Sequence, residues 1–344
     1  MIKSHFFAVI IALIAAFAFG ISTPLSKLLV ADLNPFLLAG LLYLGAGIGL
    51  APFSLLGPKD DLLGKIKANS QFVLGMIFFG GLLGPVLLMM AIKMASAASI
   101  SLWLNLELAA TAFLGHFIFK DYMGRRAWVS VLVSLFAGGL LSYGGGGAGI
   151  LAGILVALAC FCWGLDNHYT ALIDNLSPVQ STVIKGLCAG STNFIIGLAL
   201  SGWTITPTLS LKAMAVGFVC YGVSIALYIA SAQKLGAVRS QLLFSIAPIF
   251  GVVGSLALLH EKLSLVQIIS GGLLICSAWL MLSEKHSHLH EHEAREHSHQ
   301  HSHDDLHHAH HGDTQIGSHS HIHRHIPLSH KHMHCPDLHH RHGH

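Results

Sequence analysis

Ten stretches of mostly apolar residues, each close to the roughly 20 residues that a transmembrane helix needs, follow one another through the first 283 residues of the chain. Inside a bilayer, backbone polar groups are satisfied only within helices or closed barrels. The pattern therefore predicts an all-α integral membrane protein. The ten predicted spans are residues 5–30, 35–56, 70–92, 96–118, 127–143, 149–173, 178–200, 212–232, 237–259 and 264–283.

The composition excludes several other classes of protein. Charged residues make up 10% of the chain and hydrophobic residues 53%, whereas a soluble protein carries about a quarter charged residues. The basic residues form no dense patch, so nucleic acid is not expected as a partner. The chain has no nucleotide-binding loop, no soluble domain and no nucleophile constellation. We therefore expect a protein that is not an enzyme.

The lysines and arginines of the connecting segments predict the orientation. If the N-terminus is inside, the inner segments carry ten of these residues and the outer segments carry three. Cytoplasmic segments carry the excess of positive charge in most membrane proteins. Both termini are therefore expected in the cytoplasm, in a multi-pass protein whose main partner is the lipid bilayer.

The chain also repeats itself. The parallel motifs are Phe17 to Gly20 with Phe161 to Gly164, Asn34-Pro35 with Ser177-Pro178, and Lys120-Asp121 with His260-Glu261. Each half holds five spans, and because five is odd, the second half must enter the bilayer from the opposite side. The sequence predicts an inverted repeat of residues 1–143 and 149–283, an architecture that places a substrate site near the midplane.

These features resemble the drug/metabolite transporter superfamily, specifically its EamA-like branch of ten-span carriers. The residues that carry the resemblance are the glycines, prolines and acidic residues at matching places in the two halves: Gly20, Gly164, Pro35, Pro178, Asp121, Glu261 and Pro248. The resemblance covers residues 5–283 and implies a carrier of small solutes in the bacterial inner membrane. The chain departs from the family pattern at Asn105 and Glu107, where such carriers often have a proline.

Glu107 is the main candidate for a functional group inside the bilayer. It lies eleven residues from either end of the fourth span, and an ionisable residue at that depth is a candidate functional group by default. Glu107 can bind a cation or carry a coupling proton. The alternative is a protonated acid that only forms a hydrogen bond with a neighbouring helix. Asn105 and His116 share the same span and complete this candidate group.

The sixth span contains Asp166, Asn167 and His168 in succession. Lys185 in the seventh span lies at nearly the same depth, which predicts an Asp166–Lys185 ion pair that either neutralises two charges or acts as a switch. A carboxylate, an amide and an imidazole together suit a divalent cation. Successive residues do not share one helix face, so all three could bind one ion only if the helix breaks at Gly164.

The last part of the chain, residues 284–344, differs sharply in composition from the rest and is called the tail. Residues 286–344 hold 23 of the 27 histidines and too few apolar residues to form a core, so we expect them to be disordered without a ligand. Neutral imidazole binds nickel, cobalt, zinc and copper(II). The candidate ligands are the alternating histidines: His286, His288, His290, His292, His297, His299, His301, His303, His319, His321, His323, His325, His330, His332 and His334.

The sequence leaves three functions open. The first is proton-coupled efflux of a divalent transition-metal cation, such as nickel, cobalt or zinc, which the tail collects in the cytoplasm. The second is export of an organic metabolite or drug, with the tail only regulating transport. The third is a membrane-anchored metal buffer or sensor without flux. No cofactor is obligatory in any of them, and the sequence leaves a homodimer open.

Overall fold

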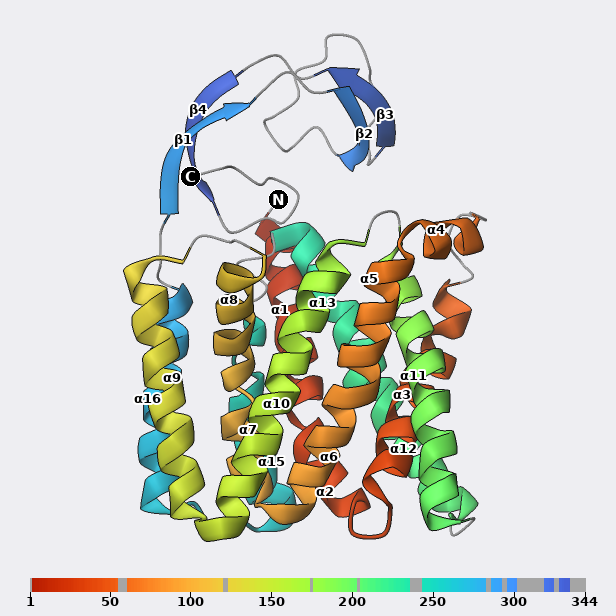
Figure 1. The fold of residues 1–344 in the computed structure, drawn as a ribbon, viewed down its shortest axis with the longest axis vertical. Helices are drawn as coiled ribbons and strands as arrows, with labels where there is room; N and C mark the ends of the chain where they lie inside the picture. The colour runs from red at the N-terminus through yellow and green to blue at the C-terminus, as the bar shows by residue number, and fades with distance from the viewer. Residues whose placement is uncertain are drawn as a thin grey trace. The chain divides into compact units, whose positions relative to one another are not determined.

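The structure is a computed structural model, and it describes residues 2–54, 61–119, 123–173, 176–202, 205–235, 243–282, 286–292, 296–301, 319–324 and 328–334. The chain forms two compact units, Met1–Glu284 and Lys285–His344. The first unit is a bundle of helices (Figure 1). The second unit contains short strands.

The helices of the first unit follow the predicted spans and are grouped here as spans 1 to 10. In the first half, span 1 is α1 (Ile2–Gly20) with α2 (Ser22–Leu29), span 2 is α3 (Pro35–Ser54), span 3 is α5 (Ser70–Gly75), η1 (Met76–Leu83) and α6 (Gly84–Met94), span 4 is α7 (Ala97–Trp103) with α8 (Leu106–Phe117), and span 5 is α9 (Arg125–Gly144). In the second half, span 6 is α10 (Gly146–Ala171), span 7 is α11 (Pro178–Ser201), and span 8 is α12 (Pro207–Val216), η2 (Gly217–Val223) and α13 (Ser224–Leu235). Span 9 includes α15 (Ala247–Leu259), and span 10 is α16 (Leu265–Leu282). A short helix, α4 (Leu62–Ala68), precedes span 3.

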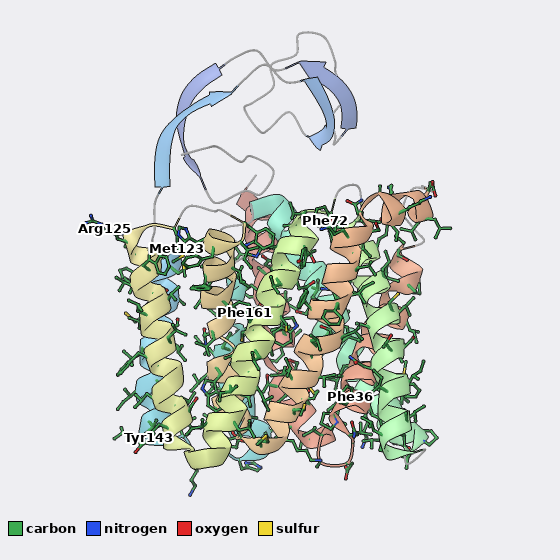
Figure 2. All side chains as sticks on the ribbon, viewed as in Figure 1. Phe36, Phe72, Met123, Arg125, Tyr143 and Phe161 are labelled. Atoms are coloured by element: carbon green, nitrogen blue, oxygen red, sulfur yellow. The ribbon has the colours of Figure 1, made fainter. Side chains whose placement is uncertain are left out.

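Eight of the described helices, those of spans 1 to 8, are long and apolar enough to cross a membrane. Two shorter apolar helices, Ala247–Leu259 and Leu265–Met281, lie where the ninth and tenth spans are predicted. Figure 2 shows Phe72 and Arg125, which begin spans 3 and 5, toward one end of the bundle, and Phe36 and Tyr143 toward the other. The predicted all-α membrane fold is confirmed.

Several contacts between spans follow one pattern in both halves. When each span of such a contact is replaced by its counterpart in the other half, five places away, the result is another observed contact. Span 1 packs on spans 8 and 9, and span 6 packs in the same way on spans 3 and 4. Spans 2 and 7 pack on each other, as do spans 5 and 10. Gly40 and Gly190 allow spans 2 and 7 to approach closely, because a Cβ atom on Gly190 would lie 2.7 Å from the Leu44 nitrogen. This is the pairing that an inverted repeat of five spans requires.

Two kinds of irregularity also recur in the two halves. Span 4 is interrupted by a turn between α7 and α8, and residues 245–246 form a turn just before α15 in span 9. Spans 3 and 8 each contain a π-helical segment, η1 and η2, flanked by α-helix. π-Helical segments are rare and frequently mark functional sites. Because η1 and η2 occupy equivalent places in the two halves, spans 3 and 8 are candidates for part of a functional site.

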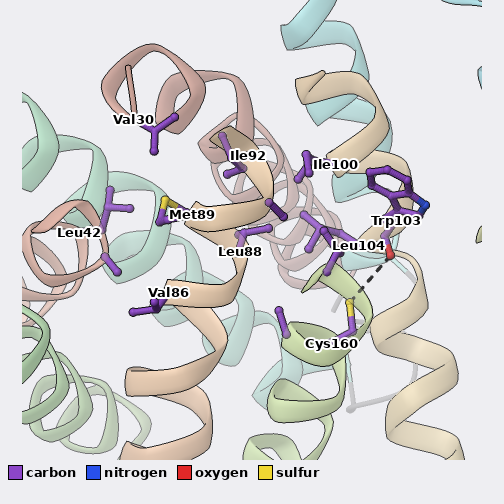
Figure 3. Packing of buried hydrophobic residues seen from close by; sticks show 14 of the residues in the cluster. Val30, Leu42, Val86, Leu88, Met89, Ile92, Ile100, Trp103, Leu104 and Cys160 are labelled. Carbon is purple, nitrogen blue, oxygen red and sulfur yellow. Dashed lines mark hydrogen bonds between the residues drawn. The ribbon is translucent and has the colours of Figure 1, made fainter. Parts of the chain in front are cut away.

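Buried apolar side chains, most of them from spans 1 to 4 and span 6, form the core (Figure 3). Val30, Leu42 and Met89 lie on one side of the view, and Trp103 and Cys160 on the other. The Cys160 thiol contacts the Trp103 carbonyl oxygen at 3.9 Å. This packing fixes span 4 against span 6, and these two spans carry most of the site described below.

The second unit contains four strands: β1 (His286–His292), β2 (Glu296–His301), β3 (His319–Arg324) and β4 (Leu328–His334). β1 pairs with β4 and β2 pairs with β3, both antiparallel. The strands lie within residues 284–344, for which the sequence predicts disorder in the absence of a ligand. Histidine alternates with other residues along them, and a two-residue period matches the alternation of a β-strand. His303 and His325 lie outside the described residues.

Candidate transport site

Glu107 lies in the first turn of α8 and contacts span 6. The Asn167 side-chain amide donates hydrogen bonds to Glu107 Oε1 at 3.1 Å and to Thr111 Oγ1 at 3.3 Å. Thr111 follows Glu107 by four residues, so both side chains occupy one face of α8. One amide thus joins a carboxylate and a hydroxyl across two spans, and three oxygen-bearing side chains meet at one place.

Asn167 is exposed, although it does not lie on the outer face of α10. The outer face carries exposed apolar side chains, including Ile154, Leu158 and Phe161, the last of which is labelled in Figure 2. At 3.6 residues per turn, Asn167 projects from the opposite side of the helix. Its exposed amide is therefore accessible from within the bundle, next to the partly exposed Glu107.

Asp166 forms an ion pair on the neighbouring face of α10. Lys185 Nζ lies 2.6 Å from Asp166 Oδ2, and the Thr170 hydroxyl donates to Asp166 Oδ1 at 3.2 Å. The side chains of Lys185 and Asp166 are 13% and 8% exposed. The ion pair predicted from the sequence is confirmed, and it is largely buried. Glu107, Thr111, Asp166, Asn167 and Lys185 are called the central polar site below.

The π-helical segment η1 lies against this site and accepts hydrogen bonds through its backbone. The Tyr43 hydroxyl donates to the Gly80 carbonyl oxygen at 2.8 Å, and the Trp163 indole donates to the same oxygen at 3.3 Å. The Asn193 amide donates to the carbonyl oxygens of Gly81 and Leu82 at 3.2 Å and 3.3 Å. Side chains of spans 2, 6 and 7 thus hold this irregular backbone in place.

Aromatic rings from both halves border the same region. Tyr43 of span 2 and Tyr221 of span 8 have ring centroids 5.8 Å apart, and Phe19 of span 1 lies 6.0 Å from Tyr221. Phe244 lies 5.4 Å from Phe19 and 4.8 Å from Tyr228. These rings present apolar and polarisable surface, and Tyr43 joins them to the Gly80 backbone, which lies against Asp166.

The condition under which Asp166, Asn167 and His168 could bind one metal ion, a helix break at Gly164, is not met in this structure. α10 continues through Gly164 to Ala171, so the three side chains project in different directions. Asp166 contacts Lys185, Asn167 contacts Glu107, and His168 Nδ1 lies 2.7 Å from the Gly164 carbonyl oxygen. Among the residues whose side chains the structure describes, no group of three His, Cys, Asp or Glu could hold a metal ion.

His168, His116 and Asn105 lie apart from the central polar site. The His168 ring stacks on Phe119 with centroids 4.2 Å apart. The His116 ring packs edge-on against Trp128 at 5.4 Å, and it follows Glu107 by nine residues, which is about 13 Å along a helix. The Asn105 amide donates to the Leu102 carbonyl oxygen at 3.1 Å, within the turn that interrupts span 4.

Charged side chains from other parts of the chain cap the two helix ends at the connection between spans 3 and 4. Lys27 of span 1 donates to the carbonyl oxygens of Ile92 and Ala95 at 2.5 Å and 2.8 Å. The Glu261 carboxylate, which follows α15, accepts from the backbone N–H groups of Ala97 and Ala98 at 2.8 Å and 2.9 Å. A cation thus caps the end of α6 and an anion caps the start of α7, as the helix dipole favours. Asp121, the matching acid of the first half, lies outside the described residues.

A substitution at Gly80 tests how tightly span 3 packs against the Asp166–Lys185 ion pair. A Cβ atom at this position would collide with the Asp166 carboxyl group, whereas a Cβ on Gly139 of α9 would meet nothing within 4 Å. We expect Gly80→Ala to destabilise the protein by about 1–3 kcal/mol through overpacking. Gly139→Ala is the matched control and should be neutral or slightly stabilising. Thermal unfolding in detergent measures both, and equal behaviour of the two variants would contradict this packing.

Sequence reasoning missed several members of this site. Thr111 and Thr170 could have been found, because each follows an acidic residue of the candidate group by four positions in a helix. The contribution of Tyr43, Trp163 and the Gly80 carbonyl had no such signal. It depends on η1, whose π-helical hydrogen bonding has no pattern in the residue types.

A bundle of membrane-spanning helices in two matching halves, with a polar and charged site between the halves, is the architecture of a membrane transport protein. The chain belongs to the EamA-like transporter family, whose model matches residues 6–143 and again residues 150–283. The family thus accounts for the whole helical unit. This agrees with the expectation that the chain is not an enzyme.

The known proteins that are similar to this chain include a curated relative and a solved structure. An uncharacterized transporter of Methanothermobacter thermautotrophicus is 25% identical over 289 residues, which cover 78% of this chain and 83% of the relative. A solved structure described only as "Crystal structure of protein" is 16% identical, with a TM-score of 0.55, over 80% of this chain and 96% of the other. The second likeness concerns the fold alone.

Proposed function

We propose that this protein is a proton-coupled exporter of a divalent transition-metal cation, of which nickel, cobalt and zinc are the candidates. Glu107 is the group that exchanges the cation for a proton. The observation that carries the proposal is the contact of Asn167 with both Glu107 and Thr111, which gathers three oxygen-bearing side chains at an accessible place between spans 4 and 6.

The charge of the central polar site supports a cationic substrate. Lys185 neutralises Asp166 in the ion pair, and the neighbour of Glu107 is the neutral amide of Asn167. An ionised Glu107 therefore leaves the site with one net negative charge. A carboxylate inside a membrane is stabilised by a proton or a cation. Competition between the two for one carboxylate gives exchange of cargo for protons.

The tail supplies the second part of the proposal. With both termini in the cytoplasm of a bacterial inner-membrane protein, the histidines collect metal ions on the side from which export begins. The two matched segments, 6–143 and 150–283, would act as the two halves of a carrier with alternating access. Bound ions would be cargo or regulators, and no resident cofactor is required.

Flux into proteoliposomes tests this proposal. With a metal-sensitive dye inside the vesicles, we expect a pH gradient to drive nickel, cobalt or zinc across the membrane. A chain that ends at residue 283 should still transport, but should need a higher metal concentration for half-maximal rate, because the collecting sites are gone. Metal binding without flux of any ion would favour the buffer or sensor, and would contradict the proposal.

Export of an organic solute, with a regulatory tail, is the second candidate. The observation that favours it is the set of rings formed by Phe19, Tyr43, Tyr221, Tyr228 and Phe244. Aromatic faces beside a carboxylate attract organic cations. Uptake of a fluorescent organic cation driven by a pH gradient, in vesicles that move no metal, would decide for this candidate.

A further inference from the structure

We propose that the metal sites of the tail are pairs of histidines that face each other across two antiparallel strand pairs, three pairs in each. The inference rests on the proposed function, in which the tail binds transition-metal ions, and it adds a defined arrangement to that binding. The strands concerned are β1 with β4 and β2 with β3.

The register of the strands carries this inference. In both strand pairs, each histidine position but one lies opposite another histidine position. The facing positions are His286 with His334, His288 with His332, His290 with His330, His297 with His323, His299 with His321, and His301 with His319. The exception is His292, which lies opposite Leu328.

The arrangement depends on the register of the strands, because a shift by one residue, or by any odd number of residues, would remove it. Successive residues of a strand belong to opposite faces, so histidines at alternate positions share one face. If β4 moved by one residue relative to β1, its histidines would lie opposite residues such as Ser287 and Leu289. The register that the structure has is therefore one of those, two residues apart, that place histidine positions opposite each other.

The spacing suits transition-metal ions. Facing Cα atoms in an antiparallel pair are about 4.5–5.5 Å apart, and alternate positions on a strand are about 7 Å apart. Two imidazoles with water, or four imidazoles from two adjacent pairs, satisfy the four-coordinate preference of zinc and the nitrogen preference of nickel. The proposed arrangement thus gives several similar sites along each strand pair.

Disulfide formation tests the register directly in the full-length protein. In a Cys335→Ser background, Ser287→Cys combined with Met333→Cys places two thiols at facing positions. The control combines Ser287→Cys with Lys331→Cys, which lies opposite Leu289 and is therefore two residues off the register. We expect the first variant to form an intramolecular disulfide under mild oxidation without metal, and the control to form far less. Equal disulfide formation in the two variants would overturn the inference.

Metal binding tests the pairs themselves, with a control that the chain provides. His290→Ser breaks a pair, whereas His292→Ser removes a histidine that faces Leu328. Titrating the full-length protein in detergent with nickel, we expect His290→Ser to lose roughly one bound ion per chain and His292→Ser to lose none. Equal losses in both variants would overturn the inference.

The outcomes separate this inference from the proposed function. If proton-driven metal flux is present while both variants behave alike, the proposed function stands and the pairing is wrong. If His290→Ser differs from His292→Ser in metal binding while no metal is transported, the pairing stands and the proposed substrate is wrong.

Discussion

Glu107→Gln is expected to reduce pH-driven transport to the background of protein-free vesicles. Glutamine keeps the size of the side chain and can still contact the Asn167 amide through its own oxygen, so the bundle should fold. The change removes the only group of the Glu107, Thr111 and Asn167 cluster that can release a proton. Flux in proteoliposomes with an imposed pH gradient measures the loss.

Thr111→Val is the matched control for this experiment. It removes the second hydrogen bond of Asn167 but leaves the acid in place. We expect Thr111→Val to change the substrate affinity by several-fold and to retain pH-driven flux, in line with the loss of one hydrogen bond. A Glu107→Gln protein that transports as fast as the wild type, under the same gradient, would show that the coupling proton binds elsewhere.

Breaking the Asp166–Lys185 ion pair is expected to have the largest effect on stability. Lys185→Met leaves a carboxylate that is 8% exposed without its cation, and such a loss typically costs about 3–5 kcal/mol. Replacing both partners, as Asp166→Asn with Lys185→Met, removes the unpaired charge and should recover most of that loss. Unfolding by SDS in mixed micelles gives the free energies for this double-mutant cycle.

The transport rate of the double variant separates the two roles that the sequence leaves open for the pair. If the pair only neutralises charge, the folded double variant should transport at the wild-type rate. If Lys185 releases Asp166 during the cycle, the double variant should be stable but inactive. A single Lys185→Met variant as stable as the wild type would contradict the burial of the pair.

The fold was largely predictable, because each span is encoded by its own residues. Length and hydropathy predicted the bounds of most spans to within a few residues. The opposite charges of Asp166 and Lys185, at nearly equal depth in neighbouring spans, predicted their ion pair. The turns in spans 4 and 9 and the π-helical segments were not predictable, because they depend on packing between the halves.

The site was predictable only in part, for a related reason. Glu107 and Asp166 stand out because charges in apolar spans are rare. The proposed cluster at residues 166–168 failed because it required a helix break at Gly164, and Gly164 instead packs against Leu114 and Thr111 of α8. The small residue there serves close helix contact, and residue type alone does not distinguish that role from a break.

Proton movement during cargo transport is the most direct test of the role proposed for Glu107. A pH-sensitive dye and a metal-sensitive dye in the same vesicles would follow both species while a metal gradient is imposed without a pH gradient. The account predicts that protons move against the metal in the wild type, and that both movements vanish in Glu107→Gln. Metal flux with no accompanying proton movement would contradict it.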